Sequence, residues 1–261
     1  MLELRHHQQL AVNSIYSYFE TGRSGHPVLE APTSAGKSLI QADFIKSVLE
    51  RWPGQRILCL AHVQELIEQN YLELVSYWAD APAGINAAGL NRRDTEAGVI
   101  FAMIQSVHKR AYELGRFDLI IIDEAHLVPV KTSEGMYRNF INDCARINPN
   151  IRIIGLSATP YRLDNGLLTE GENRLFTDII PAKRNRMTID DLLEAGYLAP
   201  LSTPKGGIKT RFSVEGVGKS GGDFKAGELA AAVDVDDVTQ AACAELARLG
   251  EYNLDGLIAR L

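Results

Sequence analysis

The sequence predicts an α/β fold in which a mostly parallel, doubly wound sheet carries helices on both faces. Short apolar runs alternate with segments of helical periodicity along the first 200 residues, as in chains built from strand–helix–strand units. Several of these runs are apolar throughout, which is typical of strands covered on both faces. A loop containing glycine and lysine, residues 31–38, also joins an apolar run to a helical segment, and α/β domains bind phosphate at such junctions.

The predicted elements follow one another in a regular order. Helices are expected where leucine, isoleucine and aromatic side chains recur at helical spacing, over residues 8–20, 37–51 and 64–78. Strands are expected where apolar residues run without interruption between polar turns, at 28–30, 56–61, 98–104, 117–123 and 151–158. This alternation places a single α/β domain over residues 1–200.

The composition changes after about residue 200. Glycines gather between Gly206 and Gly227, and the alternation from Ile208 to Glu215 predicts a strand-like hairpin. Two helices are expected after it, over residues 225–233 and 237–249. A second Gly-Lys-Ser, at 218–220, is predicted to be a flexible turn because two glycines follow it instead of a helix. We interpret residues 201–261 as a connector toward a second domain that this sequence does not contain.

Composition narrows the class of protein. Hydrophobic residues make up 46% and charged residues 23%, as in globular proteins, and we find neither a signal peptide nor an apolar run that would span a bilayer. The cysteines Cys59, Cys144 and Cys243 lie far apart, which argues against a zinc site and a disulfide framework and fits a reducing cytoplasm. The net charge of −6 gives no general attraction to nucleic acid, so any such binding must use local basic groups.

The loop APTSAGKS is the first motif with a chemical function. It follows the pattern GxxxxGK[ST], except that Ala31 takes the place of the first glycine. Lys37 would bind the β- and γ-phosphates of a nucleotide, the Ser38 hydroxyl would bind Mg²⁺, and the backbone of residues 33–36 (Thr33, Ser34, Ala35 and Gly36) would curl around the phosphates. The alternative, a chance Gly-Lys-Ser in a turn, is disfavoured because a strand precedes the loop and a helix follows it.

An acidic pair ends another predicted strand. Asp123 and Glu124 close the run DLIIIDEAH, at the end of a strand where α/β sheets bind ligands. Asp123 would hold Mg²⁺ through water, and Glu124 would orient and deprotonate the attacking water. An exposed acidic pair without function is the alternative, although it is uncommon after a buried strand. The segment SATP, 157–160, closes a further strand, and it is a weak signal by itself.

The order LRHHQ, APTSAGKS, DEAH and SATP resembles the first motor domain of superfamily-two helicases of the DEAH-box kind. The segments LAHVQELIEQN, AAGLNRR, QSVHKR, GLSATPYRLDNGLL and LLEAGYLAPL are similar to those of bacterial RadD-like DNA helicases and their phage relatives. The resemblance covers nearly the whole chain. It implies a RecA-like P-loop NTPase domain that hydrolyses ATP with Mg²⁺ and acts on nucleic acid, DNA rather than RNA.

The resemblance also implies roles for individual side chains. Gln8 would contact the adenine edge with Arg5 beside the base, although His6 and His7 stand where the family more often has Pro-Tyr. A second set would couple the nucleotide state to strand binding: His126, Ser157 and Thr159. A third set would lie against the nucleic-acid backbone: Ala61, His62, Arg92, Arg93, Gln105 and Ser106.

The nucleotide of such a motor lies between two domains, and the second domain supplies arginines. We find no QxxGRxxR-like segment here, and an arginine finger is worth ~10³–10⁵ in rate. We therefore expect this chain alone to bind Mg-nucleotide weakly, to hydrolyse it slowly and to unwind nothing. Two other hypotheses stay open: a helicase-like module that binds nucleic acid or protein without acting as a motor, and the ATPase subunit of a restriction or defence complex.

Overall fold

The computed structural model of the chain describes residues 3–128, 135–162, 166–182, 185–199, 213–220, 223–233, 239–245 and 247. The chain forms two compact units, Met1–Leu198 and Ala199–Leu261. The first unit carries the phosphate loop, the acidic pair and the segment SATP. None of the helices in the described parts of the chain has the length and apolar character of a transmembrane segment.

The first unit is built on one eight-stranded sheet, with strand order β10-β1-β7-β6-β2-β5-β3-β4. Every neighbouring pair is parallel except β3 and β4, which are antiparallel. The strands are β1 (Pro27–Glu30), β2 (Ile57–Ala61), β3 (Ala83–Ala87), β4 (Arg92–Arg93), β5 (Val99–Met103), β6 (Leu119–Ile122), β7 (Arg152–Ser157) and β10 (Asp178–Ile180). A small antiparallel pair lies apart from this sheet, β8 (Tyr161–Arg162) with β9 (Gly166–Leu167).

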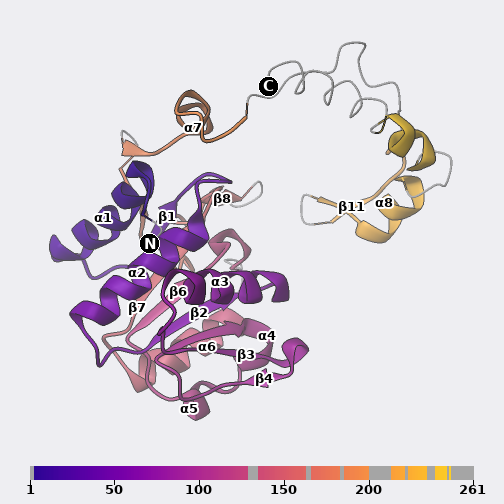
Figure 1. Cartoon of the computed structure of the whole chain (residues 1–261). Helices are drawn as coiled ribbons and strands as arrows, with labels where there is room; N and C mark the ends of the chain where they lie inside the picture. Colours follow the sequence, from indigo (N-terminus) through magenta and orange to yellow (C-terminus); the bar gives the residue numbers. More distant parts are fainter. Residues whose placement is uncertain are drawn as a thin grey trace. The chain divides into compact units, whose positions relative to one another are not determined.

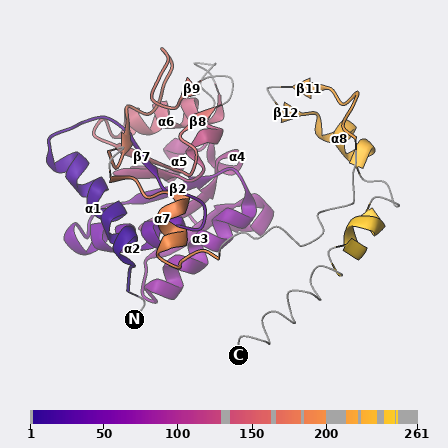
Figure 2. The same cartoon turned by 90° about the horizontal axis from the view of Figure 1, so that it is seen from above.

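Helices cover both faces of the sheet (Figures 1 and 2). One face is covered by α1 (His6–Glu20), α2 (Lys37–Arg51) and α3 (Gln64–Tyr77), and the other by α4 (Ile104–Val107), α5 (Ala111–Leu114) and α6 (Met136–Ile147). Side chains of the central strands alternate between the two cores: Cys59 packs on the first face, and Leu58 and Leu60 pack on the second. This double burial explains why all five residues of β2 are buried, and it confirms the doubly wound fold.

The predicted strands and helices of this unit are present, with bounds that differ from the predictions by no more than two residues. Several elements were not predicted: β3, β4, β10, α4, α5, α6 and α7 (Ile189–Glu194), besides the one-turn helices η1 (Ala88–Leu90) and η2 (Ala125–Leu127). The sequence of β3, AGINA, is poor in branched side chains, and β10 has only three residues at the sheet edge. Both strands therefore lack a local pattern that would reveal them.

The second unit contains a hairpin and helical segments. Strands β11 (Lys219–Ser220) and β12 (Asp223–Phe224) pair antiparallel, and α8 (Ala226–Val233) follows. The predicted flexible turn at 218–220 is wrong, because Lys219–Ser220 form a strand; two glycines between short strands are typical of a hairpin. Helix 225–233 is confirmed, and residues 239–245 of the last predicted helix are helical. Most of the strand predicted at 208–215 lies outside the described residues, and 213–215 are not in a strand.

The centre of the sheet leaves no room for a side chain at Gly155 in β7. A Cβ built there would lie 2.7 Å from the Ala125 Cβ atom and 2.8 Å from the Phe176 ring. We predict that Gly155→Ala lowers the free energy of unfolding by about 1–3 kcal/mol, because a rigid backbone neighbour and a buried ring must both move. Chemical denaturation monitored by circular dichroism measures this change.

Gly54→Ala is the matched control, since a Cβ at Gly54 meets nothing within 4 Å. We expect this variant to stay within about 0.5 kcal/mol of the unmodified chain. Equal destabilisation of both variants would contradict the packing described here.

Candidate functional site

Three neighbouring strands bring the phosphate loop, the acidic pair and the segment SATP to one edge of the sheet. In the parallel register, Glu30 at the end of β1 lies opposite Ser157 at the end of β7, and Ile122 at the end of β6 lies opposite Gly155. The phosphate loop follows β1, the acidic pair follows β6, and the segment SATP begins with the last residue of β7. The carboxyl ends of β1, β7 and β6 therefore place these segments side by side.

The phosphate loop begins as an extension of β1 and then turns sharply into α2. The Ala31 N–H donates to the Ser157 carbonyl at 3.0 Å, and Ala31 is not among the residues with a left-handed φ angle, so alanine can replace the glycine that the motif usually has here. Ser34 and Gly36 have left-handed φ angles of 68° and 79°, and a Cβ at Gly36 would lie 2.4 Å from Gln8 Nε2. Gly36 is thus required for both its conformation and its close contact. Helix α2 starts at Lys37, so its unpaired first-turn N–H groups face the loop.

Helix α1 supports the loop through a single carbonyl group. Gln8 Nε2 donates to the Ala35 carbonyl at 3.1 Å, and His7 Nε2 lies 3.1 Å from the same oxygen. Because a carbonyl can only accept, this His7 nitrogen carries the hydrogen; burial lowers the pKa of His7, which favours a neutral ring. Gln8 Oε1 accepts from the Arg5 N–H at 2.9 Å. Gln8, predicted to contact adenine, therefore has both ends of its amide bonded within the chain.

The acidic pair adopts an unusual backbone that directs Glu124 toward the loop. Glu124 has φ 47° and ψ 53°, a left-handed conformation that costs a non-glycine residue about 1–3 kcal/mol. Its carboxylate lies 3.0 Å from Lys37 Nζ through Oε1 and 3.3 Å from His126 Nδ1 through Oε2. The lysine of one motif and the predicted general base of the other are thus in direct contact.

Asp123 is held differently, because its side chain is only 7% exposed. Its Oδ2 accepts from Asn70 Nδ2 at 2.8 Å, and its Oδ1 accepts from the Glu124 N–H at 2.9 Å. Burial raises the pKa of Asp123, and the hydrogen bond from Asn70 opposes that rise. The two donors orient the carboxylate and leave a lone pair on each oxygen.

These residues fit a magnesium ion bound together with phosphate. The oriented Asp123 carboxylate is a hard oxygen ligand, and Ser38 lies in the first turn of α2 next to Lys37, which contacts Glu124 at 3.0 Å. Mg²⁺ keeps most of its waters and commonly uses one or two protein ligands plus substrate phosphates. Accordingly, the described residues contain no group of three or more His, Cys, Asp or Glu side chains that could hold a metal unaided.

The predicted coupling residues form one connected group. His126 Nδ1 lies 3.1 Å from Ser157 Oγ, and that hydroxyl accepts from the Thr159 N–H at 3.1 Å. Arg162 donates from Nε to the His126 carbonyl at 2.7 Å, and it also donates to the Val128 carbonyl. Since His126 also lies beside Glu124, contacts run without a break from the phosphate loop to the segment after β7.

The predicted nucleic-acid residues lie at the carboxyl ends of β2, β5 and β3. Gln105 Nε2 donates to the His62 carbonyl at 3.1 Å, and the Ala88 N–H donates to Ser106 Oγ at 3.0 Å, so the three strand ends are linked. Ala61 is buried at the end of β2, and His62 is exposed. The basic pair occupies β4: Arg92 contacts Asp94 at 2.9 Å and lies over the Tyr71 ring, and Arg93 is exposed.

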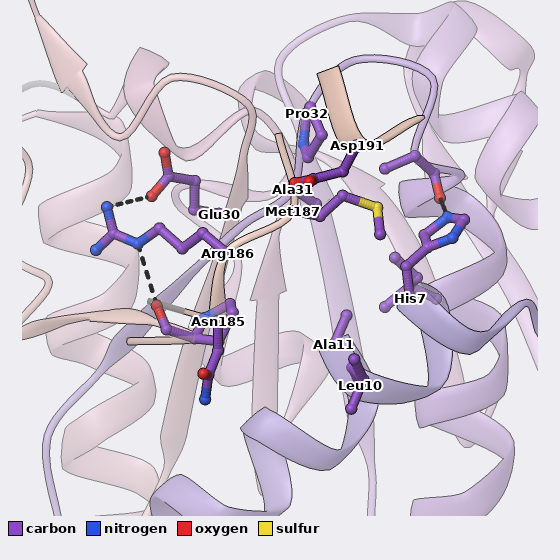
Figure 3. A pocket seen from close by; sticks show the side chains of 13 residues that line it. His7, Leu10, Ala11, Glu30, Ala31, Pro32, Asn185, Arg186, Met187 and Asp191 are labelled. Atoms are coloured by element: carbon purple, nitrogen blue, oxygen red, sulfur yellow. Dashed lines mark hydrogen bonds and ion pairs between the residues drawn. The ribbon is translucent and has the colours of Figure 1, made fainter. Parts of the chain in front are cut away.

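A pocket of about 210 Å³ opens beside the phosphate loop (Figure 3). Leu10, Ala11 and Met187 give it apolar walls, and Glu30 and Arg186 form an ion pair of 2.6 Å at one side. None of these five residues was predicted to have a function. Asn185 and Asp191 also line the pocket, and they too had no predicted role.

Helix α7 holds the far wall of this pocket against the loop. Its buried Leu192 packs with Ala31 and Ala35, and the Arg5 guanidinium lies 4.4 Å from the centre of the Tyr197 ring. The start of α7 is a capping box in which Thr188 and Asp191 exchange hydrogen bonds. That Thr-x-x-Asp spacing is visible in the sequence and could have predicted the helix, although not its position over the loop.

Comparison with known proteins supports a helicase-type domain. Residues 1–162 match the family model described as "Type III restriction enzyme, res subunit". The ATP-dependent DNA helicase uvsW of Enterobacteria phage T4 is 32% identical over 123 residues, which are 45% of this chain and 24% of that protein. A relative from the Sulfolobus islandicus filamentous virus, also named as a helicase, is 26% identical over 205 residues, 72% of this chain and 34% of its own length. The chain therefore spans about a quarter to a third of these relatives.

Solved structures share the fold. The crystal structure of the UvsW helicase from bacteriophage T4 aligns with a TM-score of 0.52 at 25% identity, covering 69% of this chain and 60% of that one. The type ISP restriction-modification enzyme LlaGI, solved with a DNA substrate mimic, aligns with a TM-score of 0.52 over 75% of this chain and 21% of its own, at 15% identity. These alignments and the sheet order confirm a RecA-like fold. The chain belongs to the family of the type III restriction enzyme res subunit, as a helicase-type domain.

Proposed function

We propose that this chain is the ATP-binding first motor domain of a DNA helicase or translocase. The observation that carries the proposal is the 3.0 Å contact between Lys37 of the phosphate loop and Glu124 of the acidic motif. Lys37 follows β1 and Glu124 follows β6, and β7 lies between these two strands in the sheet. Their contact therefore depends on the tertiary fold and not on either motif alone. The assignment to the DEAH-box, RadD-like subtype rests on the motif sequences and is part of the proposal.

The triphosphate would occupy the loop between residues 33 and 38. Lys37 donates to the β- and γ-phosphates, and the first-turn N–H groups of α2 donate to the phosphate oxygens. A triphosphate carries more negative charge than one carboxylate, so it competes for Lys37 and releases Glu124 from the ion pair.

The base would lie in the pocket of Figure 3, against Leu10, Ala11 and Met187. This pocket adjoins Ala31, Pro32 and Ala35 of the loop, so base and phosphates can be bound together. Gln8 fixes the shape of the loop through the Ala35 carbonyl, and one hydrogen of its amide remains for the adenine edge. Arg5, stacked on Tyr197, lies at the same end of α1.

Hydrolysis would use Glu124 as the base that accepts a proton from water. Asp123 and Ser38 would hold Mg²⁺, which neutralises charge on the transferring phosphoryl group. His126, between Glu124 and Ser157, transmits the position of Glu124 to the segment after β7. The arginines that complete the site would come from a second motor domain or another polypeptide, since this chain spans only part of its relatives.

A second candidate function is the ATPase part of a restriction or defence complex. The observation that favours it is the family description, which names a restriction enzyme subunit. Isolation of the tagged chain from its native host distinguishes the helicase from the restriction-complex candidate. Only the restriction-complex candidate requires a nuclease or methyltransferase to purify with the chain in a fixed stoichiometry.

Lys37→Ala should weaken ATP binding by about 10- to 100-fold, because a charge-assisted hydrogen bond contributes ~1.5–3 kcal/mol. A fluorescent ATP analogue and equilibrium titration measure the dissociation constant. The chain provides its own control in the second Gly-Lys-Ser: Lys219→Ala removes the same charge from β11. If both substitutions weaken binding equally, the loop at 31–38 is not the nucleotide site.

Glu124→Gln should leave ATP binding within about twofold and lower hydrolysis by ~10²–10⁴, because the amide cannot accept the proton. Single-turnover release of phosphate, measured with excess protein, gives the rate even when turnover is slow. Unchanged phosphate release in this variant would show that another group acts as the base.

Arg92→Ala/Arg93→Ala should weaken binding of single-stranded DNA and lower the slope of log K against log salt by about 1.4, since each phosphate contact on a single strand contributes ~0.7. Fluorescence anisotropy with a labelled oligothymidine at several salt concentrations measures this slope. The control is Arg116→Ala/Arg146→Ala, which removes two arginines that are 67% and 70% exposed elsewhere. An equal fall in the control would mean that general charge, and not β4, binds the strand.

A further inference from the structure

A buried contact connects α3 to the acidic motif. Asn70 Nδ2 donates to Asp123 Oδ2 at 2.8 Å, and the two side chains are 5% and 7% exposed. The other donor to this carboxylate is the backbone N–H of Glu124. Asn70 is thus the side chain that fixes the orientation of the Asp123 carboxylate.

Asn70 occupies a position on α3 where an apolar residue would be expected. The helix packs on the sheet through Ile67, three residues before Asn70, and Leu74, four residues after it. Both residues are at most 1% exposed. An amide on this stripe loses its hydration, which is unfavourable unless a hydrogen bond replaces it. Asp123 accepts that bond. The same bond also satisfies the buried carboxylate, which would otherwise lose its hydration without a replacement.

We propose that Asn70 is a positioning residue for the magnesium site, which holds the Asp123 carboxylate in the orientation that the metal would require. This inference rests on the proposed nucleotide-binding function. Outer partners that orient a ligating carboxylate typically change metal affinity by about 10- to 100-fold when they are removed. Asn70 has the geometry of such a partner, since it donates to Oδ2 and each oxygen of the carboxylate keeps a lone pair.

Asn70 also counteracts the effect of burial on Asp123. Burial raises the pKa of this carboxyl group, and the Asn70 hydrogen bond lowers it, because the bond stabilises the ionised form.

Asn70→Leu tests the proposal with a side chain of similar size that cannot donate. Binding of a fluorescent ATP analogue to the full chain is titrated with Mg²⁺ at one fixed pH. We expect the Mg²⁺ concentration for half-maximal binding to rise about 10-fold or more. Asn70→Ala leaves room for water and provides a second test if the leucine variant does not fold; the same direction is expected.

Asn148→Leu is the matched control. Asn148 is also 5% exposed and donates at 2.8 Å, to the Phe117 carbonyl, away from the acidic motif. It should lower the unfolding temperature while leaving the Mg²⁺ dependence unchanged. Unchanged Mg²⁺ dependence in folded Asn70 variants would overturn the positioning role and leave the nucleotide site intact. An unmodified chain that binds no nucleotide with Mg²⁺ would instead overturn both proposals.

Discussion

Parallel pairing of β1, β7 and β6 is the constraint on which the site depends. It sets Glu30 opposite Ser157 and Ile122 opposite Gly155, and each strand then ends at the same edge of the sheet. Three segments that are far apart in sequence start from that edge, so few further contacts are needed to bring Lys37 to Glu124. A shift of one residue in β7 would turn its side chains to the opposite faces and separate Ser157 from His126.

At this edge, Lys37, Asp123 and Glu124 each have a hydrogen-bond or ion-pair partner. Glu124 bears the strain of a left-handed backbone, and its contacts with Lys37 and His126 offset that cost. Asp123 is more deeply buried, and it accepts hydrogen bonds from a side chain and from the backbone. The two neighbouring carboxylates therefore have different environments, which suits two different roles, one toward a metal and one toward a proton.

Much of the fold could be predicted from the sequence because its central strands are apolar on both faces. The phosphate loop and the acidic pair could be found because each is a short pattern of neighbouring residues next to such a strand. Other features had weaker signals. Helix α6 places Tyr137, Phe140, Ile141 and Cys144 at helical spacing, a pattern that our predictions missed. The pocket depends on Arg186 meeting Glu30 across 156 positions of sequence, and no local pattern encodes such a contact. Gln8 donates to the Ala35 carbonyl of the loop, a contact that the predicted adenine role did not include.

The anchoring of the loop carbonyl Ala35 by His7 and Gln8 has a consequence for how the domain can be trimmed. Helix α1 thus supports the phosphate loop, although most of α1 lies outside the sequence motifs. A shortened version starting at Gln9 would still contain the phosphate loop, the acidic pair and the segment SATP. It would nevertheless lose the two side chains that hold the Ala35 carbonyl, so the first turn of α1 is part of what shapes the loop.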